Sequence, residues 1–215
     1  MGLRERKKQQ TRRLIAEVAW GLFADRGFDR VTVAEVAAAA QVAPATVFNY
    51  FPSKEDLFFS RLEAFGERLL EAVAGRPAGE PVLAAVRRHL LEEGGLLARA
   101  GARDALALQR LRTVNQVIAA SPALQAREEQ AIAATADALA GLLAVETGAP
   151  AGDVAARVAA SALLGVQRAL IDDTRRRVLA GDDPARLAAE VRERAEGAFA
   201  LLERGLGGYA PRPAG

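Results

Sequence analysis

The side chains with the most readable chemistry lie in residues 31–54, VTVAEVAAAAQVAPATVFNYFPSK. Asparagine can hydrogen-bond the N6 and N7 edge of adenine, so Asn49 is a candidate reader of a DNA base. Thr46 is the other main polar side chain nearby, and Pro44 and Ala45 are suited to contact thymine methyl groups. The alternative is that Asn49 is an ordinary solvent-facing helix residue. The segment predicts contact with double-stranded DNA.

Two short helices joined by a tight turn would present these side chains. Thr32 and Glu35 form a T-x-x-E capping box, which starts the first helix one residue after the threonine. Pro44 suits the first position of the second helix, which we expect to run through Asn49 or Tyr50. This layout is a helix-turn-helix, which places one helix in the major groove of DNA. A generic pair of packed helices is the alternative.

A longer helix is predicted on each side of this pair. Apolar residues recur at spacings of three and four over residues 6–26. Gly27 can then end the helix in a left-handed conformation, with Phe28 folding back on Phe23. On the other side, a Ser-x-x-Asp cap predicts a helix over residues 53–75.

The chain begins with a basic stretch. Residues 4–13 contain six lysines and arginines against one glutamate, although the net charge of the whole chain is only +2. Lysine and arginine displace counterions from the DNA backbone, so a basic arm beside a helix-turn-helix predicts phosphate contact. A solvated tail is the alternative.

The composition excludes several kinds of site. The chain has no cysteine and one histidine, His89, so we expect no disulfide framework, no thiolate nucleophile, no zinc cluster and no cofactor. The N-terminal stretch lacks the apolar core of a signal peptide, and no apolar run approaches the roughly 18 residues of a membrane span. We therefore expect a cytoplasmic protein.

Glycine, proline and capping residues divide the rest of the chain into alanine- and leucine-rich segments without two-residue alternation. This pattern predicts an all-α fold of about nine helices. The predicted domains are a helix-turn-helix DNA-binding domain over residues 1–52 and a helical bundle for effector binding and dimerisation over residues 53–208. Residues 209–215 are expected to form a flexible tail, because they are rich in glycine and proline.

A wider pattern extends across residues 11–57. It consists of Thr11, Ala19, Phe23, Gly27, Phe28, Thr32, Val33, Val36, Ala37, Ala40, Val42, Thr46, Phe48, Tyr50, Phe51, Lys54, Glu55 and Leu57. With these residues the segment resembles the N-terminal domain of the TetR family of bacterial transcriptional repressors. The aromatic pair followed three residues later by lysine is the most specific part of the resemblance.

The resemblance implies a homodimer. Each N-terminal DNA-binding domain, here called the head, would read one half of a near-palindromic operator, and the second domain would contain a small-molecule pocket. By similarity to the family, the expected phosphate contacts are Thr11, Arg12, Thr32, Tyr50 and Lys54. We assign the core of the head to Phe23, Phe28, Val36, Val47, Phe48 and Phe51.

Two residues depart from the family pattern. Gln41 stands where glycine is common, and a positive φ at that turn would cost a non-glycine residue on the order of 1 kcal/mol. Ala43 stands where a hydroxyl residue is common, so the second helix of the helix-turn-helix, here called the reading helix, lacks one cap.

The last two helical segments combine small and aliphatic residues in a way that permits close helix approach. We predict that they form the dimer interface, through Val158, Ala162, Gly165, Leu187, Val191, Ala195, Phe199 and Leu202. The alternative is that these residues belong to the core of a single chain.

Polar residues in the middle helices are candidates for an effector pocket. They are His89, Arg110, Asn115, Gln116, Gln167, Arg168 and Asp172. For each of them, a satisfied interhelical contact or a surface position is the alternative, and the more common one. The scarcity of aromatic residues after residue 65 favours a small hydrophobic ligand over a flat aromatic cation. We expect the ligand to favour a conformer in which the fourth helix moves the reading helices out of register.

The predicted function is that of a repressor, released from DNA by its ligand. A DNA-binding regulator or architectural protein without a small-molecule effector is an alternative. A helical enzyme domain fused to a DNA-binding head is a remote one, because the sequence shows no metal cluster, nucleophile and base pair or phosphate loop.

Overall fold

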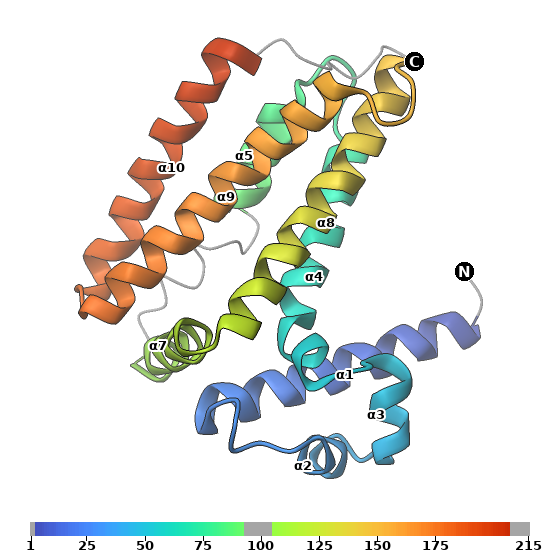
Figure 1. Cartoon of the computed structure of the whole chain (residues 1–215), viewed down its shortest axis with the longest axis vertical. Helices are drawn as coiled ribbons and strands as arrows, with labels where there is room; N and C mark the ends of the chain where they lie inside the picture. Colours follow the sequence, from blue (N-terminus) through green and yellow to red (C-terminus); the bar gives the residue numbers. More distant parts are fainter. Residues whose placement is uncertain (1–2, 93–104, 207–215) are drawn as a thin grey trace. The chain divides into compact units, whose positions relative to one another are not determined.

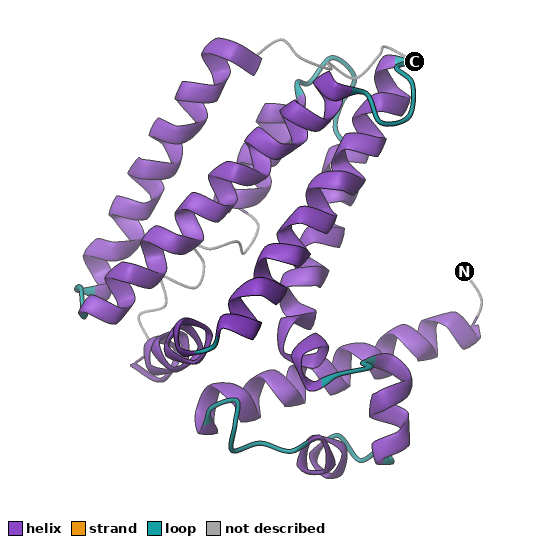
Figure 2. Cartoon of the chain, viewed as in Figure 1, coloured by secondary structure: helices purple, strands orange, loops and turns teal. Residues whose placement is uncertain are grey.

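The computed structural model describes residues 3–92 and 105–206, and these residues form nine helices with no strand among them (Figures 1 and 2). The helices are α1 (Leu3–Arg26), α2 (Val33–Ala39), α3 (Pro44–Tyr50), α4 (Lys54–Ala74), α5 (Val82–Glu92), α7 (Ala105–Ala120), α8 (Pro122–Thr147), α9 (Val154–Ala180) and α10 (Pro184–Leu206). The predicted all-α fold is confirmed. The predicted tail at residues 209–215 lies outside the described residues.

The described residues divide into two compact units. The head unit contains those up to Leu62 together with Gln109–Glu128, and the bundle unit contains those of Glu63–Leu108 and Glu129–Gly215. Both α4 and α8 therefore begin in the head unit and end in the bundle unit. These units are defined by which residues pack together, not by function. The predicted boundary between a DNA-binding domain and an effector domain, after residue 52, therefore stays a prediction.

The head unit has an aromatic core. The ring of Phe58 lies 5.6 Å from Phe23 and 5.3 Å from Phe28, centre to centre. α7 and α8 complete the same core with Val114, Ile118 and Leu124, which the sequence pattern did not place there. Aromatic pairs at such distances contribute about 0.5–1.5 kcal/mol beyond their buried area.

The predicted end of α1 is confirmed. Gly27 adopts φ +84°, and its amide donates to the carbonyl of Phe23 at 2.8 Å. Phe28 folds back so that its ring centre lies 5.4 Å from that of Phe23. Glycine meets the positive φ without strain, and the ring pair fixes the direction in which the chain continues towards α2.

The local geometry of the helix-turn-helix also follows the predicted caps. Thr32 accepts a hydrogen bond from the Glu35 amide, while the Glu35 carboxylate accepts one from the Thr32 amide. In the turn, Gln41 has φ +57°, the one positive φ among the described non-glycine residues. Ala43 caps α3 without a side-chain hydrogen bond, and Pro44 occupies the first turn.

In the bundle unit, α9 packs against α10, and α5 packs against both. Asp153 caps the start of α9 by accepting from the Ala156 amide at 2.9 Å, and Gly181 ends that helix at φ +84°. By length and composition, α9 alone among the described helices could cross a membrane; 44% of that stretch is buried within the chain, and core helices of globular proteins meet the same criterion.

In the bundle unit, two close contacts join α8 to α4 and to the residues that follow α4. Arg76 is 1% exposed and donates to both oxygens of Glu146, at 3.0 and 2.6 Å, and to the carbonyls of Val73 and Glu80. At Gly66, an added Cβ would lie 2.5 Å from the Oγ1 of Thr135. Only glycine fits this crossing without a shift of the neighbour.

Candidate nucleic-acid interface

The reading helix α3 presents one buried face and one exposed face. Val47 is fully buried in the head core, whereas Pro44, Ala45 and Asn49 are exposed and Thr46 is half-buried. The exposed residues are three of the four predicted to meet bases. On this face an asparagine amide, which can both donate and accept, stands among small apolar groups.

Phe48 does not lie in the core, so that prediction was wrong. Its side chain is 51% exposed on α3, next to Asn49. Successive residues of a helix point about 100° apart, so Val47 and Phe48 cannot both face the core from the short helix α3. Val47 takes the inward position. The exposed aromatic ring gives α3 an apolar surface beside Asn49.

Two of the predicted phosphate contacts hold their charge over an aromatic ring. The Arg12 guanidinium lies 5.2 Å from the centre of the Phe51 ring, and the Lys54 ammonium lies 4.2 Å from that of Phe28. Such cation–π contacts restrict long side chains while leaving their N–H groups able to donate. The charges therefore stand at defined points of the head unit.

The other predicted phosphate contacts are placed differently. The Thr11 hydroxyl donates to the Lys7 carbonyl at 3.0 Å, and Tyr50 is half-buried. Thr32 is exposed, but its hydroxyl is already engaged with Glu35. In the basic stretch, Arg6, Lys7, Lys8 and Arg13 are exposed along α1.

Hydrogen bonds from the cap lower the pKa of Glu35. The backbone amide of Thr32 is the largest cause, followed by Arg26, which lies 2.6 Å away, and by the Thr32 hydroxyl, and together they lower the pKa of Glu35 to about 2. The carboxylate is therefore ionised at neutral pH and completes the N-terminus of α2.

Two ion pairs join distant parts of the head unit. Arg110 on α7 binds both carboxylate oxygens of Asp25 on α1, at 2.7 and 3.0 Å, and its hydrogen bonds lower the pKa of Asp25. Arg127 on α8 binds Asp56 on α4 at 2.9 Å. Burial alone would raise the pKa of Asp56, but hydrogen bonds from Ser53 and Arg127 lower it overall. These pairs were not predicted.

The candidate ligand residues fall into both compact units. In the head unit, Arg110 is paired with Asp25, the buried Asn115 donates to the Leu111 carbonyl at 2.8 Å, and Gln116 is exposed. All three lie on α7.

In the bundle unit, the His89 ring is buried and lies 4.6 Å from that of Phe65, centre to centre. Arg168 and Asp172 are exposed on α9, and Arg168 pairs with Glu129 at 2.5 Å. Gln167 is buried on the inward face of α9.

The predicted interface residues also separate by burial. On α10, Leu187, Val191, Ala195 and Phe199 are at most 1% exposed, because α9 and α5 of the same chain cover them. For these four residues the intrachain alternative accounts for the packing. On α9, Val158 is 59% exposed and Gly165 is exposed, while Ala162 is half-buried, as is Leu202 on α10.

Metal chemistry has no candidate site in the described part of the chain, where no group of three histidine, aspartate or glutamate side chains could hold an ion.

Two family profiles match the chain. The profile described as "Bacterial regulatory proteins, tetR family" matches residues 15–60, and the profile of the MftR C-terminal domain matches residues 80–207. The second match covers more than half of the chain.

Curated relatives match over shorter stretches. The HTH-type transcriptional regulator TcmR of Streptomyces glaucescens is 40% identical over 85 residues, which is 40% of this chain and 38% of TcmR. The HTH-type transcriptional regulator LuxR of Vibrio harveyi is 50% identical over 52 residues, 24% of this chain and 23% of LuxR. Each match spans less than half of the relative.

Solved structures share the fold over nearly the whole chain. Salmonella enterica GusR matches with a TM-score of 0.54 at 19% identity, covering 92% of this chain and 96% of GusR. Bacillus subtilis FadR, solved in complex with stearoyl-CoA, matches with a TM-score of 0.50 at 22% identity, covering 86% and 96%. At these identities the likeness concerns the fold alone.

Proposed function

Because this chain belongs to the TetR family of bacterial transcriptional regulators, we propose that it is a repressor that binds a near-palindromic operator as a homodimer and is released by a small hydrophobic ligand. The main support is the exposed face of α3, on which Asn49 is flanked by apolar groups. Asn49 reads adenine, and Phe48 adds apolar contact beside it.

Phosphate contacts supply much of the affinity and set the position of the head. Lys54 and Arg12 carry this role, supported by charges held over Phe28 and Phe51. The exposed basic residues of α1 add sequence-independent attraction.

The dimer forms through the outward face of α9. Exposed Val158 and Gly165 with half-buried Ala162 support this choice, because small residues permit close helix approach. Two heads about 34–36 Å apart then meet successive major grooves.

Ligand release acts as a population shift. The bundle core is mainly aliphatic, which supports a hydrophobic ligand, and α4 runs from the bundle unit into the head unit. A ligand that favours one bundle packing therefore changes the preferred position of the helix on which Lys54 lies. An equal affinity for both packings would leave DNA binding unchanged.

Fluorescence anisotropy with DNA from upstream of the gene tests the proposal. Lys54→Ala should weaken binding to all fragments alike and lower the salt slope by about one, because one phosphate contact is lost. Asn49→Ala should instead cost about 1–3 kcal/mol at one operator position. Arg68→Ala, at an exposed position of α4 in the bundle unit, also removes one positive charge and serves as the control. Absence of binding to any palindromic upstream fragment at modest salt contradicts the proposal.

The assembly is tested by light scattering on two matched glycine variants. Gly165 and Gly141 are both exposed helical glycines at which a Cβ meets nothing within 4 Å. Gly165→Met should shift the protein from dimer to monomer, whereas Gly141→Met should not. Dimers in both variants would exclude the α9 interface.

A further inference from the structure

The inward face of α9 changes character along its length. Its first half buries aliphatic and small residues only, and these are Ala156, Ala159, Ala160, Leu163, Leu164 and Val166. From Gln167 onward, polar side chains share this face, and both Gln167 and Thr174 are only 3% exposed. Seven residues separate them, which is about two helical turns, so they lie on the same side of α9.

Several buried polar atoms in this second half have no hydrogen-bond partner among the described residues. They are the Oε1 of Gln167, the Oγ1 of Thr174, the Oδ2 of Asp173 and the Nη1 of Arg177. Helical threonines commonly donate to the carbonyl four residues earlier, as Thr147 does to Leu143 at 2.8 Å, but Thr174 does not. Buried groups of this kind call for a partner, because leaving them unpaired costs free energy.

The fixed charges around this segment balance one another. Asp173 pairs with Arg176 and Arg194, at 3.2 and 2.6 Å. Arg177 pairs with Asp182 at 2.7 Å and also with Glu190. These three acids and three arginines sum to no net charge. A charged ligand group placed here would therefore find no opposite charge left over to pair with. A neutral group with hydrogen-bond donors and acceptors suits the segment better.

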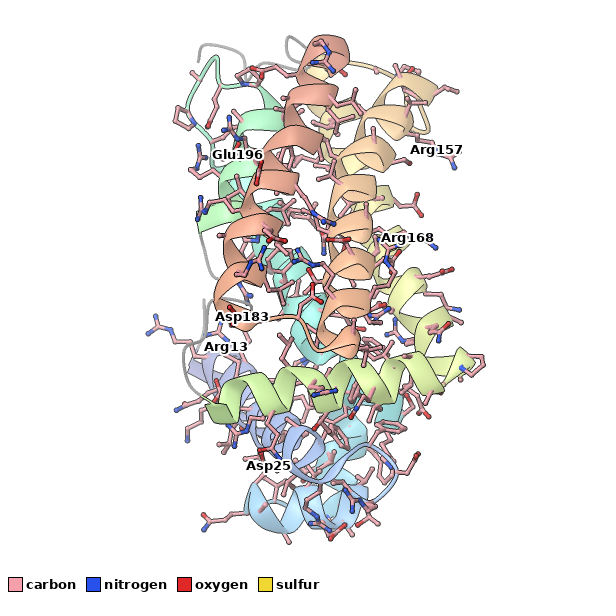
Figure 3. All side chains as sticks on the ribbon, turned by 90° about the vertical axis from the view of Figure 1, so that its left-hand side faces the viewer. Arg13, Asp25, Arg157, Arg168, Asp183 and Glu196 are labelled. Atoms are coloured by element: carbon pink, nitrogen blue, oxygen red, sulfur yellow. The ribbon has the colours of Figure 1, made fainter. Side chains whose placement is uncertain are left out.

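The segment also adjoins solvent. Arg177, Asp182 and Glu190 line a hollow of about 350 Å³ between the end of α9 and the start of α10, together with Asp183 and Arg186. Figure 3 shows Asp183 at this turn, and Arg157 and Arg168 projecting from α9 away from α10. These two arginines of α9 are therefore directed away from α10.

We propose that the effector is an uncharged amphiphile whose aliphatic chain lies along the first half of the inward face of α9, while its hydroxyl or amide head group bonds Gln167 and Thr174. This assignment rests on the proposed ligand response and names the class of ligand. The Gln167 amide oxygen accepts a hydrogen bond from the head group, and the Thr174 hydroxyl donates or accepts one.

The first test needs no ligand. Gln167→Met and Thr174→Val replace the unpaired polar atoms by apolar atoms of similar size, so each variant should unfold at a higher temperature than the wild type. Thr147→Val, which removes a hydroxyl that has a partner, should not raise the unfolding temperature. A lower unfolding temperature in both of the first two variants would mean that these side chains have partners within the chain, and would overturn the proposal.

The second test uses isothermal titration calorimetry on the full chain with four probes below their micelle concentrations: 1-monooctanoylglycerol, octanoate, octyltrimethylammonium and glycerol. The neutral octanoyl probe should bind most tightly, and Gln167→Met should weaken it about tenfold, the effect of one hydrogen bond. Tighter binding of an ionic probe, unchanged affinity in Gln167→Met, or binding by none of the four overturns the assignment. Operator binding by the wild type, measured separately, shows whether DNA recognition has also failed.

Discussion

The head unit and the bundle unit differ in whether their buried polar side chains have hydrogen-bond partners. In the described head, Ser60 donates to the Leu57 carbonyl at 2.8 Å, and Asn115 donates to that of Leu111. In the bundle, Arg76 is fully engaged, but Gln167 and Thr174 keep buried atoms without partners. This difference fits the proposed function, in which a preorganised head meets a rigid duplex and the bundle keeps hydrogen-bonding capacity for a ligand.

The two units also differ in their apolar cores. Rings of Phe23, Phe28 and Phe58 meet within 6 Å in the head, whereas the buried bundle residues are mainly leucine, valine and alanine. Rigid aromatic side chains pack in few ways, while aliphatic side chains repack at lower cost. The difference agrees with the proposed division of roles, in which the head recognises DNA with a fixed surface and the bundle responds to a ligand with an adaptable interior.

The largest expected effect concerns the engaged arginine of the bundle. Arg76→Met should lower the free energy of unfolding in urea by about 3 kcal/mol, because Glu146 and two carbonyls lose a buried cationic donor. Arg168→Met breaks a pair whose side chains are both more than half exposed, and should change stability by less than about 1 kcal/mol. Equal losses in the two variants would remove the distinction between engaged and surface charges.

A second prediction addresses the strained backbone at Gln41, in the turn of the helix-turn-helix. Gln41→Gly should raise the free energy of unfolding by about 1 kcal/mol, because glycine adopts φ +57° without the clash of a Cβ. Gln41→Ala retains the Cβ and should bring no such gain. If alanine stabilised the chain as much as glycine, the strain at this turn would be disproved.

The smallest expected effect is a dependence on pH. The pKa of Glu35 lies below its ordinary value of 4.5, at about 2, so the folded state favours the ionised carboxylate. Its contribution to stability is complete above pH 4.5 and is lost as the pH falls towards 2. The urea midpoints of wild type and Glu35→Gln should therefore converge over this range. Glu17→Gln, on the exposed face of α1, is the comparison variant.

Local signals made the head largely predictable. The cap formed by Thr32 and Glu35 and the glycine turn at Gly27 each involve residues at most five positions apart, so the sequence pattern contains both partners. Phe48 was misplaced because periodicity cannot choose between adjacent apolar residues on a helix of only two turns.

Contacts between distant residues escaped prediction. Asp25 and Arg110 are 85 positions apart, and Arg76 and Glu146 are 70 apart, and neither pair belongs to a repeating pattern. The apolar stripe of α10 was identified correctly as an apolar face. Its periodicity could not tell whether α9 of the same chain or a second copy covers it, and the burial of Phe199 shows the first.

The split origin of the head unit limits how such a protein can diversify. Val114, Ile118 and Leu124 lie more than 40 positions beyond Leu62, yet they complete the core built around Phe23. A recombination event with a single crossover after α4 would inherit the helix-turn-helix without these three side chains. We therefore expect DNA specificity to change between relatives by substitutions on the exposed face of α3. The rest of the head is expected to be inherited as one unit with α7 and the start of α8.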